Sequence, residues 1–331
     1  MDFLLKINKS IEFRKSGKLI SEVKNLQSCL KILDNTNVLL EPNFYLSWYR
    51  DYLKNKLLLA QINKYLPGII IRHKLKSVTE TAINKLIKDG KIILNDINLP
   101  LPANDREYEN YMHMIIDSIL AYLLNNIDID KLYAIYSHTL FWLEGLYEYK
   151  AVRLEKDDIV IDAGANIGAF SALAGVRECK SYAFEPIPRI INNFLSKTIE
   201  WNPNITLCKY ALADKAGELN FDEDTDSIMG SSFIMPLKKS KKVKVQTIDL
   251  DTFVEKNNLP RVDFIKADIE GAERYMIMGA KNILKEFAPK IAICTYHLPD
   301  DPQILRGLIL DSNPNYIIEE RWQKMYAYVP K

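Results

Sequence analysis

"VIDAGANIGAF", residues 160–170, decides the fold, because this stretch runs from an apolar strand into a glycine-rich turn. The turn reads Gly164-Ala165-Asn166-Ile167-Gly168, a G-x-N-x-G spacing that differs from the G-x-G-x-x-G of dinucleotide-binding turns. Asp162, two positions before the first glycine, would repel a pyrophosphate but would attract the ammonium of a bound methionine moiety. The stretch therefore favours S-adenosylmethionine over NAD as ligand, and a ligand-free strand-to-helix turn is the plainer alternative.

A second acidic residue, Glu185, ends the next apolar run, "SYAFEP" (181–186). In doubly wound sheets a carboxylate at this strand end binds the hydroxyls of a ribose. Pro186 follows it and is expected to line the same edge of the sheet. The turn and Glu185 together predict a site for a ligand that contains adenosine.

From residue 157 onward, apolar runs alternate with helical patterns. This alternation predicts an α/β domain with a Rossmann-like, largely parallel sheet that is covered on both faces. Ligands bind to such sheets at the carboxyl ends of the strands. The expected strands are 158–164, 181–186, 205–212, 262–271, 290–296, 316–321 and 325–330, and the expected helices are 169–177, 189–201, 272–285 and 301–310.

The first part of the chain has a different pattern. Residues 43–66 and 105–125 have helical periodicity, and "KIILNDINLPLP" (91–102) has the composition of a short strand or hairpin arm. We therefore expect a mostly helical N-terminal region over 1–130 and a catalytic domain over 131–331. Acceptor binding and oligomerisation are both open roles for the N-terminal region, so a homo-oligomer is compatible with the sequence.

Composition indicates in which compartment the protein works and which classes of partner it has. None of the four cysteines has metal-ligand spacing, which is typical of free thiols in a reducing cytosol, and we expect a cytoplasmic protein. The longest apolar stretch, 112–124, is too short to cross a bilayer, so no transmembrane segment is expected. The lysine-rich run 237–245 has no interleaved aromatic residues, which argues against a nucleic-acid partner. We interpret this run as a solvated loop, with contact to an anionic acceptor as the alternative.

Three acids lie at the end of the strand-like run 262–271 and just after it, in the motif "KADIEGAE" (266–273). Asp268, Glu270 and Glu273 would be costly at a buried strand end without partners. Candidate partners are the methionine ammonium, the hydroxyls of an acceptor, or a divalent metal such as Mg²⁺ held by Asp268 and Glu270. Glu273 also fits the first turn of a helix, where a negative charge is favourable.

His297 directly follows the apolar run "KIAICTY" (290–296), at the edge where ligands bind. An imidazole there could accept the proton of an acceptor hydroxyl, a role that contributes roughly 10²–10⁴-fold to a rate. We therefore expect His297 and Asp268 to be the catalytic pair, and a purely structural histidine is the alternative.

The motifs "DIVIDAGANIGAFSALA", "YAFEPIPRIINNF", "ALADKAGELNF", "VQTIDLD" and "VDFIKADIEGAERYMIMGAKNIL" occur in an order that resembles FkbM-type methyltransferases over about residues 145–331. The resemblance implies a class I methyltransferase fold, S-adenosylmethionine as donor, and O-methylation of a hydroxyl on a sugar or a glycan precursor. It also implies that Ala213 and Asp214 lie near the adenine. Ala267 is a departure, because the family more often has isoleucine there. The expected cofactor-binding residues are Asp162, Gly164, Ala165, Asn166, Gly168, Glu185, Pro186, Ala213, Asp214 and Asp268.

Two other functions remain as alternatives. The acceptor could be a small metabolite that is not a sugar. The chain could also be a non-catalytic module that binds the cofactor and holds a partner protein, although the joint presence of Asp162, Glu185, Asp268 and His297 disfavours this hypothesis.

Overall fold

The chain divides into two compact units, Met1–Leu86 with Tyr122–Leu143 and Ile87–Ala121 with Glu144–Lys331, in a computed structural model. Nearly all described residues belong to the second unit. The predicted helix over 43–66 and most of the predicted N-terminal region lie outside the described residues. The second unit also includes Ile87–Ala121, a segment that precedes the expected domain boundary at residue 130. The structure describes residues 84, 86–103, 110, 111, 114, 115, 118, 119, 122, 145–224, 228, 234 and 240–330.

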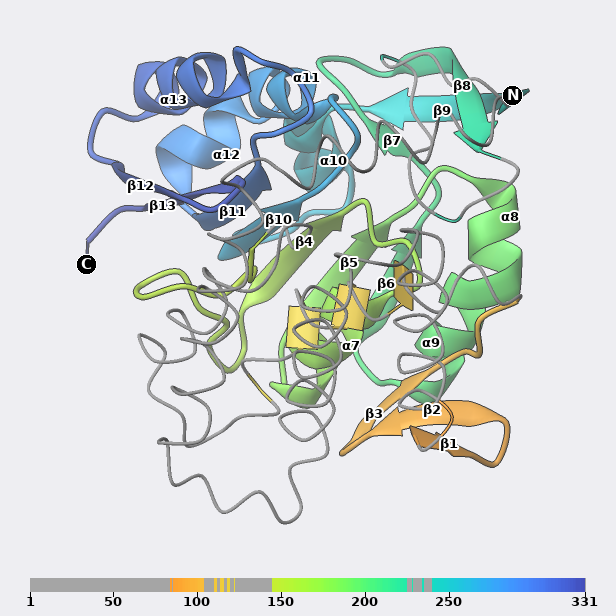
Figure 1. The fold of residues 1–331 in the computed structure, drawn as a ribbon. Coiled ribbons are helices and arrows are strands. Elements are labelled where there is room, and N and C mark those ends of the chain that lie inside the picture. Colours follow the sequence, from red (N-terminus) through yellow and green to blue (C-terminus); the bar gives the residue numbers. More distant parts are fainter. Residues whose placement is uncertain are drawn as a thin grey trace, which may run out of the picture. The chain divides into compact units, whose positions relative to one another are not determined.

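A seven-stranded sheet forms the centre of the second unit (Figure 1). Its strand order is β12-β13-β11-β10-β4-β5-β6, and every strand is parallel to its neighbours except β13, which is antiparallel to both. The strand order reverses between β4 and β10, which is where doubly wound sheets bind their ligands. The predicted Rossmann-like class I methyltransferase sheet is confirmed. Its strands are β4 Ile159–Ala163, β5 Lys180–Phe184, β6 Ile205–Cys208, β10 Phe264–Ala267, β11 Lys290–Cys294, β12 Ile317–Arg321 and β13 Lys324–Tyr328.

Helices cover both faces of this sheet, as the alternating pattern predicts (Figure 1). Ile161, Ile265 and Ile293 are buried in one core cluster together with residues of α10 to α13. The opposite face packs on α7, where the rings of Phe170 and Phe264 lie 5.6 Å apart. The helices of the sheet are α7 Ala169–Val176, α8 Pro188–Ile190, a π-helical turn Ile191–Leu195, α9 Ser196–Trp201, α10 Leu250–Lys256, α11 Glu273–Met278, α12 Lys281–Glu286 and α13 Asp301–Ser312.

Two helical predictions need correction. The helix expected over 272–285 is two helices, α11 and α12, which separate at Gly279 and Ala280. Gly279 packs so closely that a β-carbon there would lie 2.3 Å from the carbonyl oxygen of Ala213. Helix α10 was not predicted, although Asp249 caps it by accepting a hydrogen bond from the backbone N–H of Thr252 at 2.8 Å.

The strand expected over 205–212 is also divided, because β6 belongs to the central sheet and β7 (Ala211–Leu212) to another sheet. That sheet has the order β7-β9-β8, with β8 at Gly217–Asp224 and β9 at Ser240–Ile248. Strand β9 carries much of the lysine-rich run, so the solvated loop expected there is wrong for 240–245. The run pairs with an acidic strand, and Lys242 and Lys244 form ion pairs of 2.8 and 2.9 Å with Asp222 and Glu218.

Residues 91–102 form a hairpin arm, as expected. Strands β1 (Ile87–Lys88), β2 (Lys91–Leu94) and β3 (Ile97–Leu99) make a small antiparallel sheet. The side chain of Asn202, which follows α9, joins this sheet to the domain by bonding both backbone groups of Asn98. No helix among the described residues is both long and apolar enough to cross a bilayer.

Candidate active site

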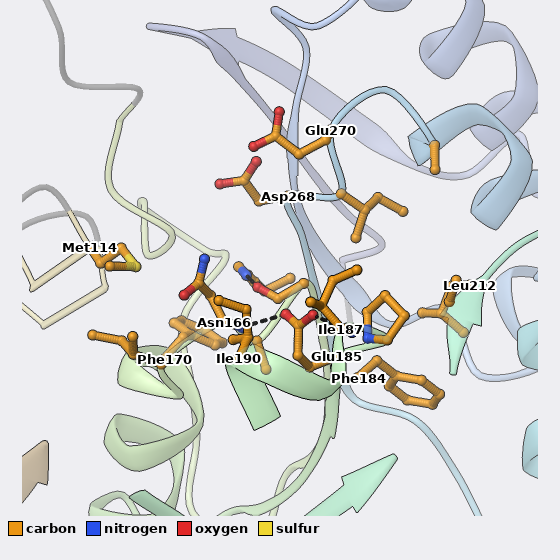
Figure 2. Close-up of a pocket in the computed structure, with 18 of the residues that line it drawn as sticks. Met114, Asn166, Phe170, Phe184, Glu185, Ile187, Ile190, Leu212, Asp268 and Glu270 are labelled. Atoms are coloured by element: carbon orange, nitrogen blue, oxygen red, sulfur yellow. Dashed lines mark hydrogen bonds between the residues drawn. The ribbon is translucent and has the colours of Figure 1, made fainter. Parts of the chain in front are cut away.

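A pocket opens at the carboxyl edge of β4, β5 and β10, where the strand order reverses (Figure 2). Figure 2 shows Glu185 among apolar side chains, with Asp268 and Glu270 together at another side of the pocket. The pocket brings together seven of the predicted residues: Gly164, Ala165, Asn166, Glu185, Pro186, Asp268 and Glu270. Five predicted residues do not line it: Asp162, Gly168, Ala213, Asp214 and His297.

The turn after β4 requires its glycines. Gly164 has a φ of 73°, and a β-carbon there would lie 1.9 Å from the backbone oxygen of Asp268. Gly168 has a φ of 83°, and a β-carbon there would lie 2.8 Å from Leu195 and from Thr198. Asn166 adopts a φ of 50°, a left-handed conformation that asparagine tolerates better than most residues. The G-x-N-x-G spacing therefore brings the β4 and β10 loops into direct contact beside the pocket.

Glu185 is buried at the end of β5, and its two carboxylate oxygens face different backbone groups. One oxygen accepts the N–H of Ile187 at 2.9 Å and the other accepts the N–H of Asn166 at 3.2 Å. Burial raises the pKa of Glu185 to about 7, although these two hydrogen bonds act in the opposite direction. Each oxygen keeps a lone pair that a ligand hydroxyl could use.

Asp162 lies beneath the pocket and does not line it. Its carboxylate is fully buried on the α7 face, 3.0 Å from Nζ of Lys266 and 2.6 Å from the hydroxyl of Ser171. Lys266 also donates to the carbonyl oxygens of Ala163 and Gly164 at 3.1 and 2.6 Å. Asp162 therefore supports the glycine turn through Lys266, and the structure gives it no direct path to a ligand ammonium.

The expected adenine neighbours also lie outside the pocket lining. Ala213 is buried and pairs with the backbone of Ile248. The lining instead includes Tyr210, Ala211 and Leu212, which come just before it in the chain. The expected contact of Ala213 and Asp214 with an adenine therefore stays a prediction.

The three acids of the β10 loop surround His297, whose side chain is 1% exposed. Nε2 lies 3.6 Å from Oδ1 of Asp268 and 3.4 Å from Oε2 of Glu270, and Nδ1 lies 3.0 Å from Oε1 of Glu273. Burial lowers the pKa of His297, but the carboxylates of Glu270, Glu273 and Asp268 outweigh it and raise the pKa far above its ordinary value. Burial likewise raises the pKa of Asp268, but His297, Lys266 and Lys324 hold it below its ordinary value.

This electrostatic environment favours the protonated form of His297, whereas a general base needs the neutral form, and the catalytic role expected for His297 stays a prediction. An imidazole that already holds its proton among three carboxylates cannot accept another one from an acceptor. Asp268 is ionised and lines the pocket, so it is the better candidate to receive a proton.

Sequence reasoning missed three residues of this site. The hydroxyl of Tyr147 donates to Oδ2 of Asp268 at 2.7 Å. Nζ of Lys266 and Nζ of Lys324 lie 5.1 and 4.2 Å from the centre of the Tyr147 ring. A signal existed for Lys266, because a lysine inside the apolar run 262–267 must find a partner once it is buried. Tyr147 precedes the recognisable motifs and carries no comparable signal.

Residues 162–322 match the family model described as the methyltransferase FkbM domain. Two curated proteins are similar: the hexuronic acid methyltransferase AglP of Haloferax volcanii, 23% identical over 158 residues, and the methyltransferase sdnD of Sordaria araneosa, 25% identical over 183 residues. The matches cover 48% of this chain and 64% of AglP, and 45% of this chain and 70% of sdnD. The matched part thus spans less than two thirds of the length of AglP.

Solved structures with a similar fold include the FkbM methyltransferase of Methylobacillus flagellatus KT and the fibrillarin of Aeropyrum pernix with bound S-adenosyl-L-methionine. The first is 19% identical with a TM-score of 0.42 and covers 79% of this chain and 60% of the other. The second is 16% identical with a TM-score of 0.34 and covers 56% of this chain and 71% of the other. The family match is independent of these values, and residues 162–322 belong to the FkbM methyltransferase domain family.

Proposed function

We propose that this protein is an S-adenosylmethionine-dependent O-methyltransferase that acts on a hydroxyl of a sugar or a glycan precursor. The observation that carries this proposal is the pocket in which Glu185 and Asp268 face a common space at the carboxyl edge of the sheet. The FkbM domain match supports the methyl-transfer class, and the similarity to AglP, which is named a hexuronic acid methyltransferase, supports a sugar acceptor.

The residues of the pocket fit the proposed donor. Asn166 Oδ1 is buried and has no hydrogen-bond partner among the described residues, so it can accept from an amino group or hydroxyl of a ligand. Glu185 would hold the ribose hydroxyls, and Phe184, Ile187, Ile190 and Leu212 offer apolar surface for the adenine. The glycine turn after β4 would support the methionine portion.

The acceptor chemistry falls to the β10 loop. S-adenosylmethionine, when bound, supplies a sulfonium methyl group, which an acceptor oxygen takes as the C–S bond breaks and its electron pair stays on sulfur. Asp268 can receive the hydroxyl proton, and Tyr147 orients it by donating to its other oxygen. Because the pKa of Asp268 is low, we expect positioning of the two reactants to contribute more than proton transfer. A divalent metal at Asp268 and Glu270 is a separate proposal, on which this chemistry does not depend.

The direct test is a transfer assay with methyl-deuterated S-adenosylmethionine and a panel of acceptors analysed by mass spectrometry. The panel should contain neutral hexosides, hexuronic acid glycosides and small hydroxyl compounds that are not sugars. A labelled methyl group on a sugar hydroxyl, absent in Asp268→Asn, is the expected result. Labelling of the non-sugar compounds alone would favour the small-metabolite alternative. If S-adenosylhomocysteine binds but no acceptor of any class is labelled, including extracts of glycan precursors, the non-catalytic module becomes the better account.

A further inference from the structure

One ring nitrogen of His297 faces two carboxylates at distances longer than an ordinary hydrogen bond. Nε2 lies 3.6 Å from Asp268 Oδ1 and 3.4 Å from Glu270 Oε2. Both ring nitrogens and Asp268 Oδ1 are buried without a hydrogen-bond partner among the described residues. A hydrogen bond from N–H to O normally spans about 2.7–3.2 Å, so these contacts are too long for direct bonds.

Each of these two separations suits a pair of ligands on one small cation. Nitrogen and carboxylate ligands lie about 2.0–2.2 Å from metals such as Zn²⁺. Two such ligands at angles between octahedral and tetrahedral are then roughly 3.0–3.5 Å apart, by simple trigonometry on those distances. The separations of Nε2 from Oδ1 and from Oε2 are close to that range. A group of possible metal ligands whose atoms all lie within 4.8 Å of one another consists of Asp268, Glu273 and His297, so it shares Asp268 and His297 with this set and has Glu273 in place of Glu270.

Further groups hold His297 and Asp268 in place. Glu273 is fully buried, and its Oε1 lies 3.0 Å from Nδ1 of His297 and accepts the N–H of Ile269 at 2.8 Å. Tyr147 donates to the Asp268 oxygen that faces away from this contact. Metal sites use such partners, above all a carboxylate on the second nitrogen of a ligating histidine, to orient their ligands.

We propose that Asp268 Oδ1, Glu270 Oε2 and His297 Nε2 bind a divalent transition metal of the Mn²⁺ type, with Glu273 orienting the imidazole. One imidazole nitrogen and two carboxylate oxygens favour such an ion over Ca²⁺ or Mg²⁺, which prefer oxygen ligands alone. Asp268 and Glu270 line the pocket, so the remaining coordination positions are open to oxygens of an acceptor. This role rests on the proposed methyl transfer, whereas binding of the ion does not.

The test is a titration of the full-length, chelator-treated protein with Mn²⁺, followed by electron paramagnetic resonance without donor or acceptor. We expect one ion per chain, and an echo-modulation spectrum that contains the nitrogen of a coordinated imidazole. In His297→Gln the nitrogen signal should disappear. Glu270→Gln and Glu273→Gln should each weaken binding by about tenfold or more. Glu255→Gln, which changes an exposed acid on α10, serves as the matched control and should bind Mn²⁺ like the wild type.

A spectrum that remains that of unbound, aqueous Mn²⁺ throughout the titration would overturn the proposal. So would a bound ion whose spectrum and affinity are unchanged in Glu270→Gln and His297→Gln. If circular dichroism shows that His297→Gln does not fold, Glu270→Gln and Asp268→Asn decide the outcome. Binding of S-adenosylhomocysteine, measured on the same preparation, separates the ion site from the proposed function. If S-adenosylhomocysteine does not bind, the proposed function is refuted, whereas the ion site is unaffected.

Discussion

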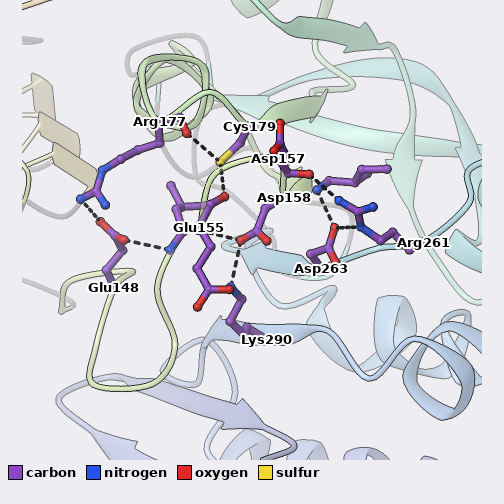
Figure 3. Close-up of polar contacts among 11 residues, drawn as sticks. Glu148, Glu155, Asp157, Asp158, Arg177, Cys179, Arg261, Asp263 and Lys290 are labelled. Carbon is purple, nitrogen blue, oxygen red and sulfur yellow. Dashed lines mark hydrogen bonds and ion pairs between the residues drawn. The ribbon is translucent and has the colours of Figure 1, made fainter. Parts of the chain in front are cut away.

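The two edges of the central sheet both carry buried or half-buried charges, but the charges are paired to different degrees at the two edges. At the amino edge, basic groups match the acids (Figure 3). Lys290 lies 2.9 Å from Asp158, Arg261 lies 2.7 Å from Asp263, and Arg177 lies 3.3 Å from Glu148. Backbone N–H groups of Glu155, Ile159 and Leu154 also donate to these acids.

The carboxyl edge places three acids around one of the described histidines, with Lys266 and Lys324 as further cations beside Asp268. Asp268, Glu270 and Glu273 surround His297, and several of their buried polar atoms have no hydrogen-bond partner among the described residues. Acids occur at both edges, but here they surround an imidazole in place of Lys or Arg, and the pairing is incomplete beside a pocket. Completed pairing indicates a structural role, and incomplete pairing beside a cavity indicates a place for a ligand.

The largest effect should come from Gly164→Ala, which places a β-carbon against the Asp268 backbone where no side chain can move aside. We expect a loss of roughly 4 kcal/mol or more of the free energy of unfolding, the range in which backbone strain at special positions is found. Denaturant unfolding measures it. The matched control is Gly307→Ala in α13, where a β-carbon meets open space, and it should stabilise the protein by about 0.5–1 kcal/mol. A stable Gly164→Ala protein would contradict the tight contact between the two loops.

Lys266→Met should have the next largest effect, since it leaves Asp162 as a fully buried charge without a cation. Removing one partner of a buried ion pair costs about 3–5 kcal/mol. The same substitution at the amino edge, Lys290→Met, affects a lysine whose side chain is 16% exposed and should cost clearly less. Equal losses in thermal unfolding would show that the two edges do not differ as described.

Glu185→Gln should weaken binding of S-adenosylhomocysteine by about 1–3 kcal/mol, because ligand hydroxyls lose a charged acceptor. It should also change the pH dependence of unfolding. Burial raises the pKa of Glu185 to about 7 in the folded state, above its ordinary value of 4.5, so the wild type loses stability as pH rises from 4.5 to 7. The variant lacks this loss and should gain relative stability of the order of 2–3 kcal/mol by pH 8. If the stability curves of the two proteins are parallel between pH 5 and pH 8, the raised pKa assigned to Glu185 is refuted.

The smallest effect belongs to the exposed pair between β8 and β9. Lys242→Ala breaks the ion pair with Asp222, in which the lysine side chain is 69% exposed. Exposed pairs contribute little, so the free energy of unfolding should fall only slightly, and added salt should reduce the difference further. The affinities for S-adenosylhomocysteine and for the acceptor should not change. A large loss of affinity for the acceptor would instead support the alternative that this lysine-rich run contacts an anionic acceptor.

Much of the sheet and of the glycine turn could be predicted from local patterns. The alternation of apolar runs with helices gives the strand positions, and the spacing of Gly164, Asn166 and Gly168 gives the turn, because these features depend on near neighbours in the chain. The strand expected over 205–212 could not be divided correctly, since its second half pairs with β9, more than thirty residues later. Pairing between distant segments leaves little trace in local periodicity.

The roles of side chains in the site were harder to predict for the same reason. Asp162 was placed at the correct strand end, but the register with β10 sets it beside Lys266, and of the two only Lys266 lines the pocket. His297 was correctly placed near Asp268, yet its protonation depends on Glu270 and Glu273, whose approach requires the folded loop. Proximity could be inferred from strand ends, whereas pKa values and hydrogen-bond partners required the three-dimensional arrangement.

The most direct test of the difference between the edges is a calorimetric titration of three proteins with S-adenosylhomocysteine: the wild type, Glu185→Gln at the carboxyl edge and Arg261→Gln at the amino edge. NAD serves as the control ligand. The account predicts one site in the wild type, the same affinity in Arg261→Gln, weaker binding in Glu185→Gln and no binding of NAD. Binding of NAD, or an affinity for S-adenosylhomocysteine that falls in Arg261→Gln and not in Glu185→Gln, would contradict it.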